Sequence, residues 1–139
     1  MTAADQSAGS SHWSIDLLGS SPTVLSVLRR KVALVLADLE EDYLADVLLV
    51  AVELVSNAFD HSDGPREFRM TRTDTPCSIG IEVDDDSTAS PVLGQSRFVR
   101  EHRGRGLIVV NTLATSWGMT VHSGIKTVWA QVPCEQPRS

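Results

Sequence analysis

The sequence has few cysteines, few basic residues and no long apolar run, and each shortage excludes a class of protein. Its 2 cysteines, Cys77 and Cys134, show no metal-ligand spacing. They exclude a disulfide framework, and we expect free thiols in a reducing cytoplasm. No segment approaches the ~20 apolar residues that cross a bilayer, so no membrane association is expected. Residues 1–11 contain an acid and no base, and no apolar run follows them, so we expect no secretory signal.

Basic residues are outnumbered, with 12 Lys and Arg against 18 Asp and Glu. The net charge of −6 is repelled by a phosphate backbone, so direct nucleic-acid binding is not expected. A length of 139 residues and a hydrophobic content of 42% suit one globular domain that needs no cross-link to fold. We expect that domain over residues 12–133, between a disordered tail at 1–11 and a short tail at 134–139.

Apolar periodicity predicts the order of strands and helices. A strand at 12–18 precedes an amphipathic helix, with Ser21 as its N-cap, Pro22 as its first residue and apolar positions as far as Leu39. The remaining expected elements are a nearly all-apolar helix at about 42–60, strands at 67–73 and 78–83, a polar segment at 84–103, a helix from Gly104 that ends at Trp117–Gly118, and a hairpin of strands at 119–122 and 127–132. This order predicts an α+β fold, a two-layer α/β sandwich with helices on one face of a mixed, mainly antiparallel sheet.

The apolar second helix carries one polar stripe, formed by Glu53, Asn57 and His61. Each is four residues from the next, so the three share one face of the helix. Burying polar groups without partners costs about 1–3 kcal/mol each, so a stripe of this kind favours a cleft. A carboxylate, an amide and an imidazole suit hydrated Mg²⁺ with phosphates. An exposed helix end with ordinary i,i+4 pairs is the alternative.

Two further segments suit a nucleotide. Asp84, Asp85 and Asp86 follow the strand at 78–83 and can bind a metal or a base, although a solvated turn has the same composition. The Gly104-Arg105-Gly106 segment begins a predicted helix, where glycines admit a ligand and the helix N-terminus favours anions. Four arginines stand against one glutamate at 97–105, which favours a polyphosphate. A basic loop that only balances the surface charge is the alternative.

These motifs occur in the order typical of the GHKL (Bergerat-fold) ATPases. Within that superfamily the chain resembles the small bacterial anti-sigma factor serine/threonine kinases and their actinobacterial relatives. Residues 52–58 with His61 resemble the N box, residues 83–91 the first glycine box, residues 104–107 the second glycine box, and residues 126–130 the closing strand. The resemblance covers about residues 24–132 and implies this fold and nucleotide binding.

The resemblance also implies a role for each matched residue. Asn57 would coordinate Mg²⁺, Glu53 would be the general base, and His61 would lie near the phosphates. Asp85 would recognise the adenine amino group, and Thr127 would lie just behind the groups that touch the base. The other residues expected to bind ATP are in the glycine boxes: Ser87, Arg103, Gly104, Arg105, Gly106 and Leu107.

Some residues depart from the family pattern. Ser87 and Ala89 replace glycines of the wider superfamily, and Arg103 stands where a small residue commonly precedes the second box. Our first hypothesis is a cytoplasmic, homodimeric kinase that uses ATP and Mg²⁺, sequesters a sigma factor and phosphorylates a STAS-domain anti-anti-sigma antagonist. The alternative is a catalytically silent, ATP-gated regulatory module of the same fold. A domain that has lost nucleotide binding is a third reading.

Overall fold

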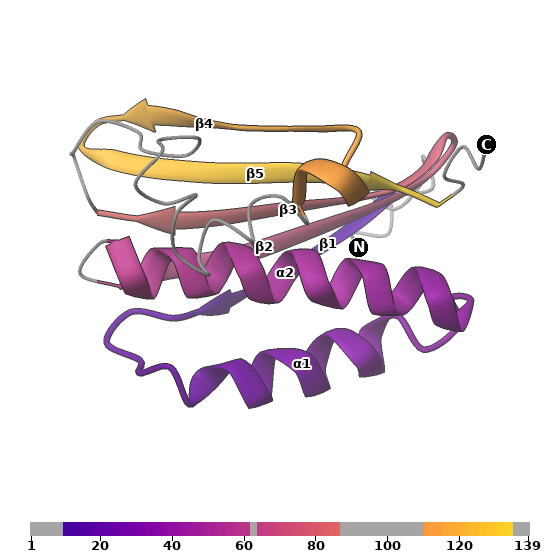
Figure 1. Cartoon of the computed structure of the whole chain (residues 1–139), viewed down its shortest axis with the longest axis horizontal. Helices are drawn as coiled ribbons and strands as arrows, with labels where there is room; N and C mark the ends of the chain where they lie inside the picture. Colours follow the sequence, from indigo (N-terminus) through magenta and orange to yellow (C-terminus); the bar gives the residue numbers. More distant parts are fainter. Residues whose placement is uncertain (1–9, 62–63, 87–109, 135–139) are drawn as a thin grey trace, which may run out of the picture.

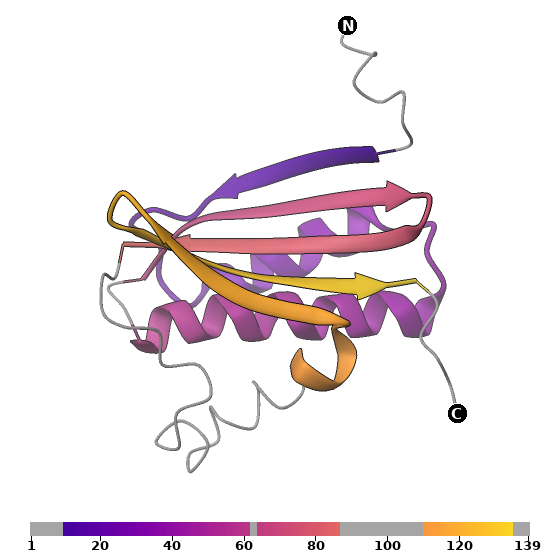
Figure 2. The ribbon, with the colours of Figure 1, turned by 90° about the horizontal axis from the view of Figure 1, so that it is seen from above.

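Five strands form a single sheet in the computed structural model, which describes residues 10–61, 64–86 and 110–134. The strands are β1 (Ser10–Asp16), β2 (Pro65–Asp74), β3 (Cys77–Asp85), β4 (Ser116–His122) and β5 (Ile125–Pro133). Their order is β1-β2-β3-β5-β4, and each of these pairings is antiparallel. Figure 2 shows this order from above, with β1 and β4 at the two edges. The predicted α+β fold is confirmed, with an antiparallel sheet where the sequence left room for a mixed one.

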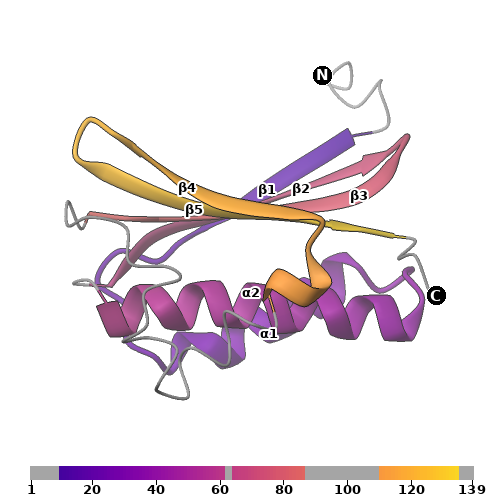
Figure 3. The same ribbon diagram turned by 45° about the horizontal axis from the view of Figure 1, so that its top comes forward.

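Two helices, α1 (Val24–Val35) and α2 (Glu41–His61), lie on the same face of the sheet (Figures 1 and 3). Among the described residues no helix covers the opposite face. The two layers are those predicted from the sequence, and α2 has nearly the predicted bounds. A carboxylate oxygen of Glu40 accepts a 3.1 Å hydrogen bond from the backbone N–H of Tyr43, which satisfies one of the open donors at the start of α2.

The start and end of α1 differ from the prediction. Thr23, rather than Ser21, occupies the N-cap position. The Ser21 and Thr23 hydroxyls lie 2.8 Å apart and hydrogen-bond each other, so Pro22 belongs to the turn before the helix. At the other end α1 stops at Val35, although Leu39 beyond it still packs against the core.

The core lies between the sheet and the helices, and strand alternation sorts the side chains between the two faces. Every second residue of the three central strands faces the helices and is buried, as period-two patterning requires: Phe68 and Met70, then Ile79, Ile81 and Val83, then Val128, Ala130 and Val132. The face of α2 that meets them is equally apolar and includes Val47, Val50, Ala51, Leu54 and Val55. The residues between these strand positions therefore point to the open face.

The predicted C-terminal hairpin is confirmed, and its turn residues Ser123 and Gly124 both have positive φ, 55° and 79°. This backbone suits a two-residue hairpin turn. The predicted helix end at Trp117–Gly118 is wrong, because β4 begins at Ser116. Residues 110–113 are helical, and the expected helix start at Gly104 lies outside the described residues.

The predicted free thiols are wrong as well, because Cys77 and Cys134 form a disulfide. Cys77 opens β3 and Cys134 follows β5, and the antiparallel pairing of Ser78 with Pro133 brings their Cα atoms to 5.3 Å. At the other end of the chain, β1 begins at Ser10, inside the segment expected to be a tail. The rest of both expected tails, residues 1–9 and 135–139, lies outside the described residues.

Candidate nucleotide site

The buried amide of Asn57 is the first element of the candidate site. Asn57 lies one turn before the end of α2 and is 7% exposed. Neither its Oδ1 nor its Nδ2 has a hydrogen-bond partner among the residues that the structure describes. Leaving a buried amide unpaired costs on the order of 1–3 kcal/mol. A ligand, an ion or water that reached this amide would satisfy both atoms.

The other members of the polar stripe follow the geometry of α2. Glu53 lies one turn before Asn57 and is partly buried, so the helix holds the two side chains on one flank. His61 is the last residue of α2, and its side chain is not among the described groups. The structure thus brings Glu53 and Asn57 together on one flank of α2, and the role of His61 stays a prediction.

A buried ion pair on the sheet forms the second part of the candidate site. Asp85 ends β3 and pairs in register with Lys126 of β5. Asp85 is 1% exposed and Lys126 is 6% exposed. The Lys126 Nζ and Asp85 Oδ2 atoms lie 3.6 Å apart. Strand alternation places both side chains on the face that carries the helices, at the end where Pro65, just beyond α2, pairs with Asp85.

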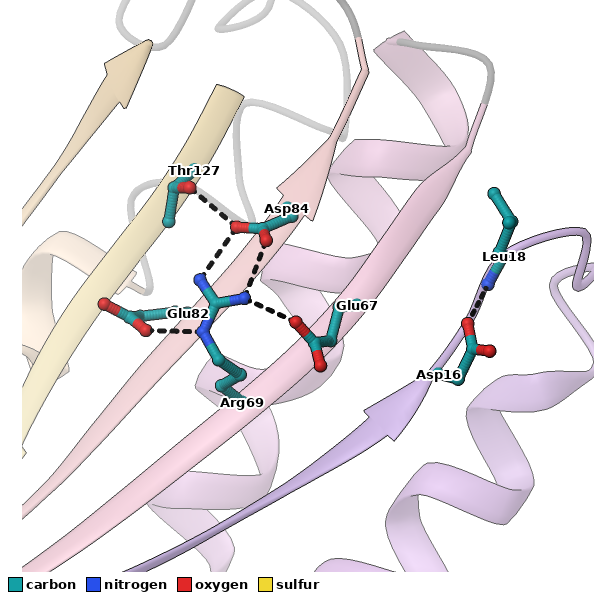
Figure 4. Close-up of polar contacts among 7 residues, drawn as sticks. All are labelled: Asp16, Leu18, Glu67, Arg69, Glu82, Asp84 and Thr127. Atoms are coloured by element: carbon teal, nitrogen blue, oxygen red, sulfur yellow. Dashed lines mark hydrogen bonds and ion pairs between the residues drawn. The ribbon is translucent and has the colours of Figure 1, made fainter. Parts of the chain in front are cut away.

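The neighbouring residues Asp84 and Thr127 point the opposite way. On the open face, the Arg69 guanidinium donates two hydrogen bonds to Asp84, at 2.6 and 2.8 Å, and one each to Glu82 and Glu67. The Thr127 hydroxyl donates a 2.6 Å hydrogen bond to Asp84. Figure 4 shows these side chains together in front of the strands, with α2 behind them. Thr127 therefore contacts Asp84 and lies on the other face from Asp85.

Asp84 and Arg69 of this open-face cluster stabilise each other's charged forms. Burial alone would raise the pKa of Asp84, but hydrogen bonds from Arg69 and Thr127 outweigh it and hold the pKa below its usual value. The hydrogen bond from Arg69 to Asp84 likewise raises the already high pKa of the guanidinium. The charged hydrogen bonds of the cluster link β2, β3 and β5 near the end of β3. Asp85, the next residue of β3, lies on the other face of the sheet at this point.

The remaining predicted ATP-binding residues all fall between positions 87 and 107. Ser87, Arg103, Gly104, Arg105, Gly106 and Leu107 all lie outside the described residues, and their roles stay predictions.

Sequence reasoning missed Lys126 as a site residue, although a signal was available. Lys126 has the same strand parity as Val128, Ala130 and Val132, so period-two alternation assigns it to the buried face.

The donor set fits a nucleotide with a hydrated metal. An amide oxygen and a nearby carboxylate suit Mg²⁺, which takes few protein ligands and keeps several waters. No group of three or more His, Cys, Asp or Glu in the described part of the chain could hold a metal alone. A site completed by phosphate oxygens and water does not need such a group. Such a metal would therefore depend on the Asn57 amide, which no other described side chain or backbone group engages.

Comparison with known families agrees with this geometry. The family model for the histidine kinase-like ATPase domain matches residues 18–132. The chain therefore belongs to the histidine kinase-like ATPase domain family, and membership of this ATPase family implies ATP binding. None of the curated proteins matches the chain significantly. In the described ranges no helix is both long and apolar enough to cross a membrane.

Proposed function

We propose that this domain is a protein serine/threonine kinase that uses ATP and Mg²⁺ and acts as an anti-sigma factor. It would work in the cytoplasm as a homodimer, hold a sigma factor away from RNA polymerase and phosphorylate a STAS-domain antagonist. The single observation that best supports the proposal is the buried amide of Asn57, which has no hydrogen-bond partner in the described part of the chain. Glu53 lies one turn away on the same helix, and Asp85 ends the strand next to the end of that helix.

The chemistry assigned to each residue follows from its functional group. The Asn57 amide oxygen would hold Mg²⁺, which neutralises charge on the phosphates when bound. Asp85 would accept a hydrogen bond from the adenine amino group. In the transfer step the substrate hydroxyl oxygen bonds to the γ-phosphorus, the bond from that phosphorus to the bridging oxygen of ADP breaks, and the hydroxyl proton moves to Glu53. Phosphoryl transfer needs mainly positioning and charge stabilisation, which suits so small a set of groups.

Nucleotide binding is tested by thermal unfolding with and without ATP and Mg²⁺. ATP should raise the melting temperature of the parent protein, because a ligand that binds only the folded state stabilises it. Asn57→Ala and Asp85→Asn should each abolish the shift. Glu82→Gln is the matched control, since Glu82 lies on β3 but faces away from the site. Shifts that persist in both site variants would contradict this placement of the site.

Catalysis is tested with ATP and a cognate STAS-domain protein. We expect phosphate to appear on a serine or threonine of that protein, and Glu53→Gln should bind ATP normally but transfer about 10²–10⁴-fold more slowly. ATP binding without transfer to any partner would favour the catalytically silent, ATP-gated module. Equal transfer by the parent and Glu53→Gln would remove Glu53 as the general base.

A further inference from the structure

The proposed kinase chemistry gives a role to Asp85 but none to Lys126, the lysine with which it forms a buried pair. Both side chains are almost fully buried, and they lie directly opposite each other on adjacent strands. Their closest charged atoms are 3.6 Å apart, which is beyond the ordinary length of an N–H···O hydrogen bond. The ammonium group therefore feels the carboxylate charge without committing a donor to a short bond with it.

Burial of this lysine needs a further reason. Taking an ammonium out of water is unfavourable, and attraction to one carboxylate offsets this cost only when good hydrogen bonds satisfy the ammonium as well. The same face of β5 continues with Val128, Ala130 and Val132, all buried, so an apolar residue at 126 would follow the pattern of the strand. A lysine here supplies hydrogen-bond donors beyond the single charge pair that the described residues give it.

We propose that Lys126 is a base-recognition residue of the nucleotide site, which donates a hydrogen bond to ring nitrogen N1 of adenine while Asp85 accepts one from the neighbouring amino group. This inference rests on the proposed ATP site. One edge of adenine presents an amino donor beside a ring-nitrogen acceptor. A carboxylate acceptor beside an ammonium donor is the complementary arrangement, and the residue pair 85 and 126 provides it on the helix-bearing face of the sheet.

The test is a cycle of two proteins and two nucleotides. The parent and Lys126→Met are each titrated with ATP and with 1-deaza-ATP, in which N1 is replaced by C–H. The parent should bind 1-deaza-ATP about tenfold or more weakly than ATP, as expected for loss of a hydrogen bond to a charged donor. Lys126→Met should bind ATP more weakly by a similar factor and no longer distinguish the two nucleotides. An unchanged ratio of affinities in Lys126→Met would overturn the inference.

Two further variants separate recognition from folding. Lys126→Gln keeps a neutral donor of similar length and should recover part of the preference for ATP over 1-deaza-ATP, which a lysine needed only as a counter-ion would not predict. Lys31→Met is the matched control, because Lys31 is exposed and lies over the Trp13 ring at 5.6 Å. It should leave both affinities unchanged.

The outcomes for the two proposals are distinguishable. A parent protein that binds no ATP overturns the proposed function and this inference with it. ATP binding that requires Asp85 but ignores N1 overturns only the role of Lys126. Tighter binding of GTP than of ATP also overturns it, because the pair would then be matched to the carbonyl and ring N–H of guanine.

Discussion

Tyr43 is the single tyrosine of the chain, and it joins the two layers of the fold. Its hydroxyl donates a buried 2.6 Å hydrogen bond to the backbone carbonyl of Val132 on β5. Burial raises the pKa of Tyr43 to about 12, because the interior disfavours the phenolate. This residue therefore offers a direct spectroscopic measure of how well α2 is seated on the sheet.

We predict that Tyr43 ionises near pH 12 in the folded protein and near its ordinary value of ~10 in urea. The folded state keeps its proton where the unfolded state loses it, so the free energy of unfolding should fall by about 1.4 kcal/mol per pH unit as pH rises through this window. Absorbance of the tyrosinate measures the ionisation, and urea unfolding measures the stability. Tyr43→Phe should lack this part of the pH dependence. A folded-state midpoint near 10 would contradict the burial of the hydroxyl.

The hydrogen-bonded carboxylate of Asp84 should make part of the protein's stability depend on pH at the acidic end of the range. We predict that Asp84→Asn lowers the free energy of unfolding by about 1–3 kcal/mol at neutral pH, the usual range for a lost hydrogen bond to a charged group. The folded pKa is depressed, so this stabilisation is complete above ~4 and disappears as pH falls through the folded value. The difference between parent and variant in urea unfolding should therefore close in acid.

Asp38 provides the comparison for that prediction. Its carboxylate also receives two hydrogen bonds from one arginine, Arg72. The Asp38 side chain is 63% exposed, however, against 17% for Asp84, and ion pairs of an exposed carboxylate contribute little. Asp38→Asn should leave stability nearly unchanged across the same pH range. Equal losses in Asp38→Asn and Asp84→Asn would mean that the deeper burial of the Asp84 carboxylate has no energetic consequence.

Lys126 and Thr127 follow directly after the turn of the β4–β5 hairpin, so their positions depend on that turn. The turn contains two residues with positive φ. We predict that Gly124→Ala destabilises the protein by about 1–2 kcal/mol, because φ near 79° forces a Cβ into the left-handed region. Ser123→Asn should be neutral or stabilising, since asparagine tolerates φ near 55° better than serine. Urea unfolding of the two variants measures this contrast. A neutral Gly124→Ala would show that the turn can change type without cost.

The elements were largely predictable from the sequence, because their signals are local. Each local pattern predicts its own element. The apolar run predicts α2, the alternation of apolar and polar residues predicts β2, β3 and β5, and Ser123-Gly124 predicts the hairpin turn. The end of the third helix was misplaced because Trp117 and Gly118 look like a helix stop locally. In the structure Gly118 belongs to β4, and a Cβ there would lie 3.1 Å from the Trp129 ring, a contact that depends on strand pairing.

The candidate site was predictable only in part, because some of its contacts are local in sequence and others depend on strand pairing. The spacing of Glu53 and Asn57 along one helix identified their shared flank. The two partners found on neighbouring strands, Lys126 for Asp85 and Thr127 for Asp84, depend on the β3–β5 register, which no local pattern specifies. The pairing of the cysteines was missed on the same ground.

The disulfide joins the ends of β3 and β5 that lie farthest from the candidate site. Cys77 and Asp85 are the first and last residues of β3, about 26 Å apart at the usual rise per residue. A cross-link over a sequence separation of 57 restricts the unfolded chain, with an upper value of about 4 kcal/mol. It should therefore affect the stability of the whole molecule without altering nucleotide binding.

We predict that the Cys77→Ser, Cys134→Ser double variant unfolds at lower urea concentration, with a loss of up to about 4 kcal/mol. A reducing agent should destabilise the parent by a similar amount and leave the double variant unchanged, which separates the cross-link from the substitutions. The affinity for ATP should be the same in both proteins at urea-free conditions, since Asp85, Lys126 and Asn57 all lie at the other end of the layers. Parent protein that keeps its stability under reducing agent while its thiols become reactive would show that strand pairing alone holds this end of the sheet. Weaker ATP binding in the double variant would instead mean that the far end of β3 is coupled to the site.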